Sequence, residues 1–292
     1  MPSLDDLKKR IKSVKSTQKI TKAMKMVAAA KLRKAQENAE KGRPYSQKMQ
    51  NIILNLTKSI NDPNNAPKLL VGTGKDKTYL CVVLTADRGL CGGFNTNICK
   101  LAKMNFKNIL SENKDLKIIT VGSKGLDQIK REFGKYIIKK FSFKEHKQIT
   151  FREAEIIGKE IINLFNKNEF DKCILFYNNF KNVITQIPQA QQIIPAETKN
   201  LEANRSEDFS YEFEPEEDEI LEDLLPKNIS VQVFKAFLEN AASEQGSRMT
   251  AMDNATRNAG DLVEKLTINY NRSRQASITK ELIEIISGAE SL

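Results

Sequence analysis

The sequence predicts an α/β protein, in which a Rossmann-like central domain is joined to a long antiparallel coiled coil of the N- and C-terminal helices. Helical apolar spacing at both ends, alternating strand and helix patterns between them, and the absence of Gly and Pro from Leu4 to Lys41 support this prediction. The predicted parts are an N-terminal helix (1–60), a linker (61–77), the α/β domain (78–200), an acidic loop (201–226) and a C-terminal helix (227–292).

Apolar residues recur three or four positions apart in both terminal segments, which is the period that two helices need in order to wind around each other. In the first segment they are Leu4, Leu7, Ile11, Val14, Ala28, Leu32, Ala35 and Ala39. In the last segment they are Val231, Phe234, Leu238, Ala241, Met252, Ala255, Ala259, Leu262 and Leu266. Antiparallel pairing follows if both helices leave the same central domain.

The end of the last helix is apolar on nearly every side. Its apolar residues are Ile278, Leu282, Ile283, Ile285 and Ile286. A helix that is apolar all round must be buried, and one partner helix can cover only one side of it. We therefore expect this tip to lie in an apolar socket that other chains supply.

The middle of the chain alternates between strand and helix patterns. Strands are expected at Thr78–Thr85, Leu116–Val121, Tyr136–Phe141, Cys173–Tyr177 and Val183–Ile194. Helices are expected at Asn95–Ser111, Gly125–Phe133 and Phe151–Asn168. This alternation indicates a parallel sheet covered by helices. Pro188 places the last strand at an edge, because proline cannot donate a ladder hydrogen bond.

Charge is unevenly distributed along the chain, whose net charge is +10. Residues 1–50 hold fourteen Lys and Arg against four Asp and Glu, whereas residues 202–223 hold eleven acidic residues and only Arg205. The basic helix is therefore expected to meet an acidic partner. No apolar run approaches the roughly 20 residues that a membrane-spanning helix needs.

The four cysteines form no C-x-x-C pair, and the single histidine, His146, is distant from them in sequence. Neither a zinc site nor a disulfide framework is expected, so the cysteines are interpreted as reduced thiols. The chain also has no G-x-S-x-G or H-E-x-x-H motif. We therefore expect a non-catalytic chain with no cofactor or metal of its own.

A glycine-rich turn, Asp87–Gly93, separates the first expected strand from the first central helix. This is the context of a phosphate cradle, but D-R-G-L-C-G-G fits neither G-x-G-x-x-G nor G-x-x-x-x-G-K-[ST]. Three interpretations remain: a nucleotide site, an ordinary turn, and a tight turn that presents Asp87, Arg88 and Cys91 to a partner. The last is favoured.

Three regions resemble the gamma subunit of F-type ATP synthases. They are the helix segment Gln18–Lys31, the turn Asp87–Asn95 (DRGLCGGFN) and a C-terminal set comprising Ser243–Gln245, Arg248-Met249, Arg274–Glu281 and Ser287–Ala289. The resemblance extends from about Leu4 to Ala289. It implies a central rotor shaft that penetrates a ring of three alpha and three beta subunits, where Mg-ATP and ADP are bound. It also implies that the α/β domain meets the epsilon subunit and a proton-driven membrane ring of c subunits.

The resemblance also implies roles for single residues. Those matching rotor–stator coupling positions are Met24, Lys25, Arg88, Cys91, Arg248, Arg274, Gln275, Thr279 and Glu281. Those matching contacts with epsilon or the c-ring are Tyr211, Phe213 and Gln232. For Met24, plain packing in the coiled coil remains an alternative, and Arg248 could simply lay its apolar stem beside the helix seam.

A bacterial protein, peripheral on the cytoplasmic side of the inner membrane, is the expected source and location. The inserted cysteine pair of chloroplast relatives has no counterpart beyond Cys173, and a helix seam that begins at Leu4 argues against a cleavable leader. Two alternatives remain open. A nucleic-acid-binding coiled coil would explain the basic helix but not the apolar tip. A small-molecule enzyme would bind its ligand within residues 75–195.

Overall fold

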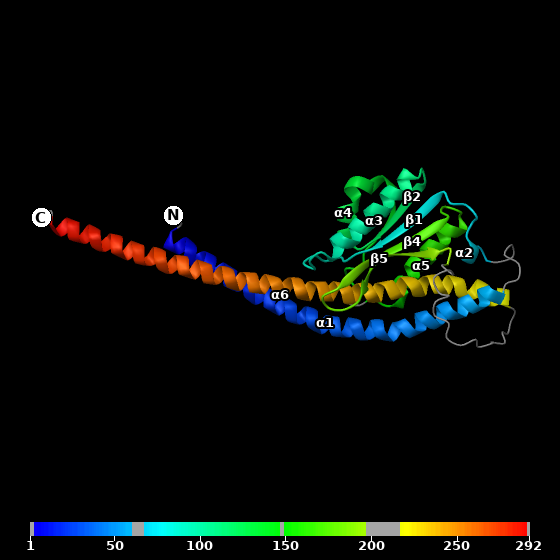
Figure 1. The fold of residues 1–292 in the computed structure, drawn as a ribbon, viewed down its shortest axis with the longest axis horizontal. Helices are drawn as coiled ribbons and strands as arrows, with labels where there is room; N and C mark the ends of the chain where they lie inside the picture. Colours follow the sequence, from blue (N-terminus) through cyan, green and yellow to red (C-terminus); the bar gives the residue numbers. More distant parts are fainter. Residues whose placement is uncertain (1–2, 60–66, 147–148, 197–216, 291–292) are drawn as a thin grey trace. The chain divides into compact units, whose positions relative to one another are not determined.

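The computed structural model describes residues 3–59, 67–146, 149–196 and 217–290. The chain divides into two compact units: one holds residues 1–29 and 248–292, and the other holds residues 30–247. Helix α1 (Leu4–Ser59) and helix α6 (Glu217–Glu290) each contribute to both units (Figure 1). The two long terminal helices and the α/β fold class are therefore confirmed.

The unit formed by residues 30–247 contains a five-stranded sheet with the order β3-β2-β1-β4-β5. Its strands are β1 (Thr78–Leu84), β2 (Asp115–Val121), β3 (Ile137–Phe141), β4 (Lys172–Phe180) and β5 (Gln186–Ile194). Strands β1 to β4 are parallel, whereas β5 pairs antiparallel with β4 at the edge. The edge position of Pro188 is confirmed, and the sheet is mixed rather than purely parallel.

Helices cover both faces of this sheet. Helices α3 (Phe94–Ser111) and α4 (Ser123–Phe133) form a buried core with one face, which contains Cys81, Phe106 and Phe176. Helix α5 (Phe151–Asn166) and the first half of α6 cover the other face. Helix α6 is therefore one of the layers of the α/β domain, which the predicted domain range of 78–200 did not include.

Two stripes of buried residues explain how α6 serves two neighbours at once. One stripe faces the sheet, and its apolar members Ile229, Val233 and Ala236 lie in the core with α5 and the strands. The second stripe includes Val231, which packs in a separate cluster with Met49 of α1. Both stripes repeat every three or four residues, as one helix with two buried faces requires.

Two boundaries differ from the predicted ones. Helix α2 (Lys68–Val71) lies within the expected linker, and α6 begins at Glu217, so it includes Pro226. Helix α1 continues through Gly42 and Pro44, as the predicted range of 1–60 requires. A proline inside a helix costs about 3 kcal/mol. Burying a leucine side chain contributes about 1.5–3 kcal/mol, and both Leu221 and Leu225 are buried in the cluster with α1. Packing therefore outweighs the local effect of Pro226.

The unit formed by residues 1–29 and 248–292 is an antiparallel pair of helices. Lys25 contacts Asp253, the hydroxyl of Thr256 donates a hydrogen bond to that of Thr21, and Gln18 lies against Gly260. As the residue number falls along α1, the number of the facing residue in α6 rises by about the same amount, as antiparallel helices require. Leu7, Ala28, Met252, Ala259 and Leu266 are buried here as predicted, whereas Leu262 is 45% exposed and does not belong to the seam.

Candidate functional site

The last turns of α6 carry the most exposed apolar surface of their unit. The register of the helix pair, carried up to Leu4, places the first described residue of α1 beside about Arg274 of α6. Beyond that level, the described part of α1 offers α6 no partner. The exposed fractions are 49% for Ile278, 53% for Leu282, 58% for Ile283, 67% for Ile285 and 57% for Ile286. Contiguous exposed apolar residues of this kind mark an interaction surface.

Four of the five predicted coupling residues of α6 lie on the same exposed stretch. Arg274, Gln275, Thr279 and Glu281 are all exposed. The Thr279 hydroxyl donates to the backbone carbonyl of Gln275, and the Ser277 hydroxyl donates to Glu281. These polar side chains are therefore accessible to a partner chain. Exposed apolar residues lie between them along the helix. Whether they meet a stator remains a prediction.

The coupling candidates of α1 are held within the helix pair. Lys25 forms an ion pair with Asp253, which also pairs with Arg257, and the hydrogen bond from Lys25 holds the pKa of Asp253 below its ordinary value. Met24 is half-buried, as is Arg248 of α6. A partner carboxylate would therefore share Lys25 with Asp253.

The glycine turn after β1 is fastened mainly by Asp87. Its carboxylate accepts hydrogen bonds from the backbone N–H and the hydroxyl of Ser123, the hydroxyl of Ser142 and the N–H of Phe143, at 2.7–3.2 Å. Burial raises the pKa of Asp87, but these hydrogen bonds outweigh it and leave the pKa below its ordinary value. Asp87 thus caps α4 and is not presented to a partner.

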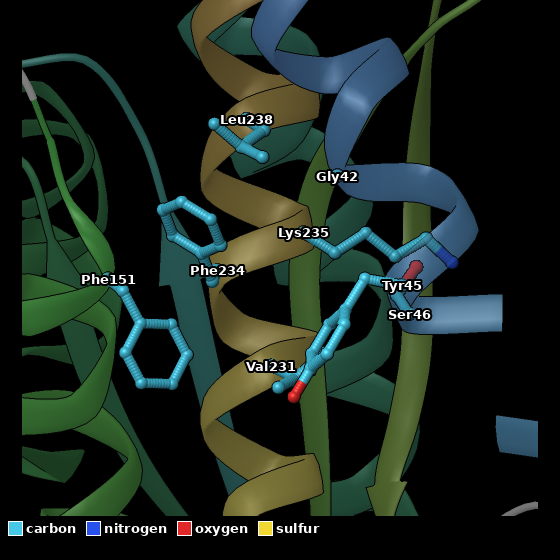
Figure 2. Close-up of a pocket in the computed structure, with 8 residues that line it drawn as sticks. All are labelled: Gly42, Tyr45, Ser46, Phe151, Val231, Phe234, Lys235 and Leu238. Carbon is cyan, nitrogen blue, oxygen red and sulfur yellow. The ribbon is translucent and has the colours of Figure 1, made fainter. Parts of the chain in front are cut away.

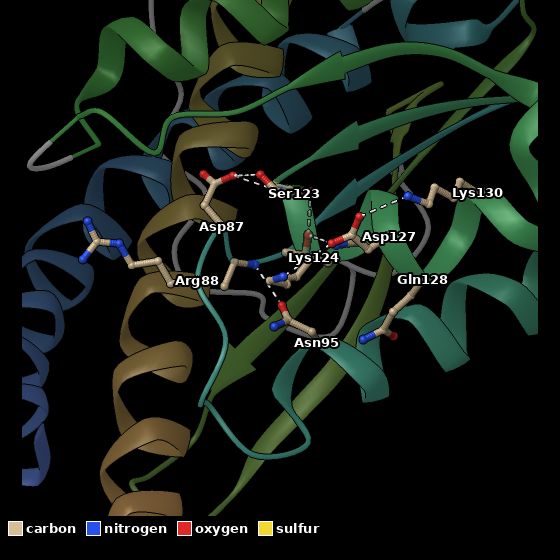
Figure 3. A network of polar contacts seen from close by, with 12 residues as sticks. Asp87, Arg88, Asn95, Ser123, Lys124, Asp127, Gln128 and Lys130 are labelled. Carbon is tan, nitrogen blue, oxygen red and sulfur yellow. Dashed lines mark hydrogen bonds and ion pairs between the residues drawn. The ribbon is translucent and has the colours of Figure 1, made fainter. Parts of the chain in front are cut away.

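Cys91 is also a structural residue, contrary to the prediction that it faces a partner. Its side chain is 2% exposed, and its sulfur accepts a hydrogen bond from the amide of Asn95. Arg88 is exposed, and Figure 3 shows its side chain extending away from the bonded cluster around Asp87. Leu90, at 65% exposure and a φ of 61°, is its exposed neighbour. The turn therefore presents Arg88 and Leu90.

The carboxyl ends of β1 and β4 form the switch point of the sheet, because the chain proceeds from β1 to β2 and β3 on one side and returns to β4 on the other. Doubly wound domains bind ligands in the crevice at this point. Here α6 fills it: the Asn240 amide donates to the carbonyl of Leu84 and accepts from the N–H of Asn178. The Ser243 hydroxyl donates to the carbonyl of Asn178, and the Ser247 hydroxyl to that of Cys91.

This arrangement leaves no open phosphate cradle at the turn, so the nucleotide-site interpretation loses its structural basis. Sequence reasoning missed Asn240 and Ser243. The signal was present, since both continue the stripe of Ile229, Val233 and Ala236 at the same spacing. Polar residues on a buried helix face indicate strand ends that need hydrogen-bond partners.

A cavity of about 360 Å³ lies along α6 between α1 and α5. Figure 2 shows Tyr45 of α1 and Phe151 of α5 on opposite sides of α6. Val231, Phe234 and Leu238 complete an apolar wall, and burial lowers the pKa of Lys235. The cavity lining holds no carboxylate, histidine or cysteine, and in the described ranges no group of three or more His, Cys, Asp or Glu could bind a metal ion.

Gln232 is buried and cannot meet epsilon or the c-ring with its side chain, which corrects the prediction. It is 3% exposed, accepts a hydrogen bond from Gln191 and donates one to Asn228. Tyr211 and Phe213, the other two residues predicted for that contact, lie outside the described residues. Among the described helices, none is long and apolar enough to span a bilayer.

Comparisons with known proteins agree with the resemblance. A family model described as ATP synthase matches residues 3–292. The ATP synthase gamma chain of Pelagibacter ubique is 73% identical over 292 residues, and that of Rhizobium etli is 57% identical over 294 residues, each with both chains fully covered.

Solved structures agree as well. A chain from the central stalk and c-ring of the Tetrahymena thermophila mitochondrial ATP synthase is 30% identical with a TM-score of 0.60, covering 81% of this chain and 99% of that one. A chain of the Euglena gracilis mitochondrial ATP synthase, 22% identical with a TM-score of 0.68, covers 99% of this chain and 94% of its own and shares the fold. The chain therefore belongs to the ATP synthase gamma chain family.

Proposed function

We propose that this chain is the central shaft of a rotary, proton-driven ATP synthase and performs no bond-making chemistry itself. The shaft would couple rotation of a c-ring to conformational cycling of three beta subunits, which alternate with three alpha subunits. Mg-ATP and ADP would be bound by those partners. The observation that carries this proposal is the apolar end of α6, which extends past the described part of α1.

A rotating contact suits this tip. At about 100° per residue, its exposed isoleucines and leucine cover an arc of about 160°, which is a broad apolar face and not the whole circumference that the sequence suggested. Apolar contact is non-directional and therefore changes little as the helix turns. Ion pairs between the tip and its surroundings are directional, so they would instead favour one rotational angle of the helix.

The α/β domain would connect the shaft with epsilon and the c-ring on the cytoplasmic side of the inner membrane. Its switch-point crevice is filled by α6 side chains, which supports a mechanical role over ligand binding. The buried thiols Cys81 and Cys173, whose pKa values are raised by burial, support neither catalysis nor redox control. The comparisons give no support to the nucleic-acid alternative.

Arg274→Ala and Gln275→Ala test this function at the predicted coupling positions. Both side chains are exposed, so the substitutions should leave folding and assembly unchanged. We expect ATP turnover of the purified complex to fall, because each residue would contact beta in one rotational state. Lys280→Ala, which removes a surface pair with Glu284, serves as the control. Normal coupled synthesis in both variants would remove these residues from the coupling site.

A further inference from the structure

One buried carboxylate joins three parts of the unit formed by residues 30–247. Glu239 of α6 is 3% exposed. It accepts hydrogen bonds from Nε and Nη2 of Arg43 on α1, at 2.8 and 3.1 Å, and from the backbone N–H of Phe180 at the end of β4, at 3.0 Å. Arg43 also donates to the carbonyl of Phe180, at 3.3 Å. The two long helices and the sheet therefore meet at Glu239.

The helices also lie very close at the same level. A Cβ atom placed on Gly42 would lie 2.7 Å from the Cδ1 atom of Leu238, so a larger residue would have to displace that side chain. Arg43 stands between Gly42 and Pro44, two residues that weaken a helix by about 1 and 3 kcal/mol. The low helix propensity of these two residues is thus tolerated at a position where α1 makes a tertiary contact. Such departures from local preference are common at functional positions.

The charges of Glu239 and Arg43 fix the geometry of this contact. A buried carboxylate must be paired, and the planar fork of arginine binds both of its oxygens in a fixed geometry. The hydrogen bond to Glu239 raises the pKa of Arg43 above its ordinary value, which favours the charged guanidinium. The Arg43 side chain is 39% exposed, so Arg43 can be changed without opening the core.

Apolar packing holds these elements together with less directional restraint than hydrogen bonds give. The cluster of Met49, Ile53 and Leu56 with Leu221 and Leu225 joins α1 to α6, and the hydrophobic contribution of such contacts is non-directional. Bidentate hydrogen bonds are directional and resist both. The contact at Glu239 adds the directional restraint, and its link to Phe180 extends that restraint to the sheet.

We propose that Glu239 is a positioning residue for torque transfer: with Arg43 it locks α1, α6 and the α/β domain so that they turn as one body. The inference rests on the proposed function. Torque that enters through the α/β domain reaches both helices only if α1 cannot slip along α6. Without the lock, slip under load dissipates part of each step before the beta subunits respond.

Arg43→Met and Glu239→Gln test the proposal in the assembled ATP synthase. The first keeps an apolar stem but removes the fork, and the second keeps the shape but removes the charge. Arg33→Met and Glu37→Gln are matched controls, because Arg33 and Glu37 form an exposed ion pair on the same helix. In inverted membrane vesicles, ATP hydrolysis and proton uptake are measured together, first without and then with an opposing proton gradient.

We expect both test variants to assemble and to hydrolyse ATP without load as the parent does. Protons moved per ATP should fall below the parent value as the opposing gradient grows, whereas both controls should follow the parent. A merely structural role would lower the yield of complex and leave this load dependence unchanged.

If Arg43→Met moves as many protons per ATP as the parent at every opposing gradient, the proposal is overturned. If Glu239→Gln does not assemble, Arg43→Met alone decides, since its site is partly exposed. If the parent complex lacks ATP-driven proton uptake although it contains this chain, the proposed function fails instead of the lock.

Discussion

At the scale of single residues, the glycines report how closely the helices of the α/β domain approach one another. A Cβ atom on Gly158 of α5 would lie 2.3 Å from the hydroxyl oxygen and 3.1 Å from the Cα atom of Ser230 on α6. The second distance involves backbone, which cannot yield as a side chain can. Gly158 therefore fixes the spacing between α5 and α6.

Gly158→Ala should lower the free energy of unfolding of the purified chain by about 1–3 kcal/mol, the usual cost of overpacking. Gly134→Ala is the control, because nothing lies within 4 Å of its added Cβ and its φ of −54° suits any residue. That control should gain about 0.4–1 kcal/mol through the unfolded chain. Urea denaturation measures both; a Gly158→Ala chain as stable as the parent would contradict the close packing.

Cys91 and Gln232 show why sequence identifies a site less well than it identifies a fold. Both sit in segments that match the family, yet their side chains are 2% and 3% exposed. On the turn that holds Cys91, the exposed residues are Arg88 and Leu90. Side-chain direction in an irregular turn depends on φ values such as the 61° of Leu90, and hydrophobic periodicity gives no information about these.

At the scale of elements, α6 changes role along its length. Its first half is a layer of the α/β domain, its middle pairs with α1, and its last turns leave that pairing. Strand and helix positions were predicted within a few residues because each central element has one clear period. The start of α6 was missed because Pro226 and the acidic composition suggested a loop, whereas burial of Leu221 and Leu225 is a tertiary effect.

The apolar tip allows a prediction about this last part of α6. Ile283→Asp should leave the unfolding free energy of the isolated chain unchanged, since the side chain is 58% exposed there. In the assembled complex it should strongly reduce ATP turnover, because placing a charge in an apolar sleeve is costly.

Ile283→Leu keeps the volume of the side chain, so it should reduce the stability of the packed tip by less than about 1.5 kcal/mol. Removal of the residues after Ser287 should also be tolerated better than the charge. Assembly yield and hydrolysis per complex are the measurements. Full turnover by Ile283→Asp would mean that no apolar sleeve surrounds this position.

At the scale of the whole molecule, the chain combines two kinds of unit with different tasks. Residues 1–29 and 248–292 form a helix pair with an apolar end, and residues 30–247 form an α/β domain built around the same two helices. Moving one charge across 100 mV yields about 2.3 kcal/mol. Several such steps must be gathered for each ATP, so the connection between domain and helices has to carry load without yielding.

The family and the two long terminal helices were predictable from sequence, because they rest on long periodic segments and three specific motifs. The filling of the switch point by Asn240 and Ser243, and the lock at Glu239, were not predicted. Both depend on residues that are far apart in sequence, such as Arg43 and Phe180, meeting at one position on α6. Such a meeting is visible only once the packing of α6 on the sheet is known.

Rotation itself is the most direct test of the central claim. All four native cysteines are buried, so Met104→Cys on α3, where the native side chain is 56% exposed, offers a selective site for a bead or fluorophore. With the alpha and beta subunits fixed to a surface and Mg-ATP supplied, we expect the probe to turn stepwise in one direction. A probe that stays still while the same complexes hydrolyse ATP would contradict it.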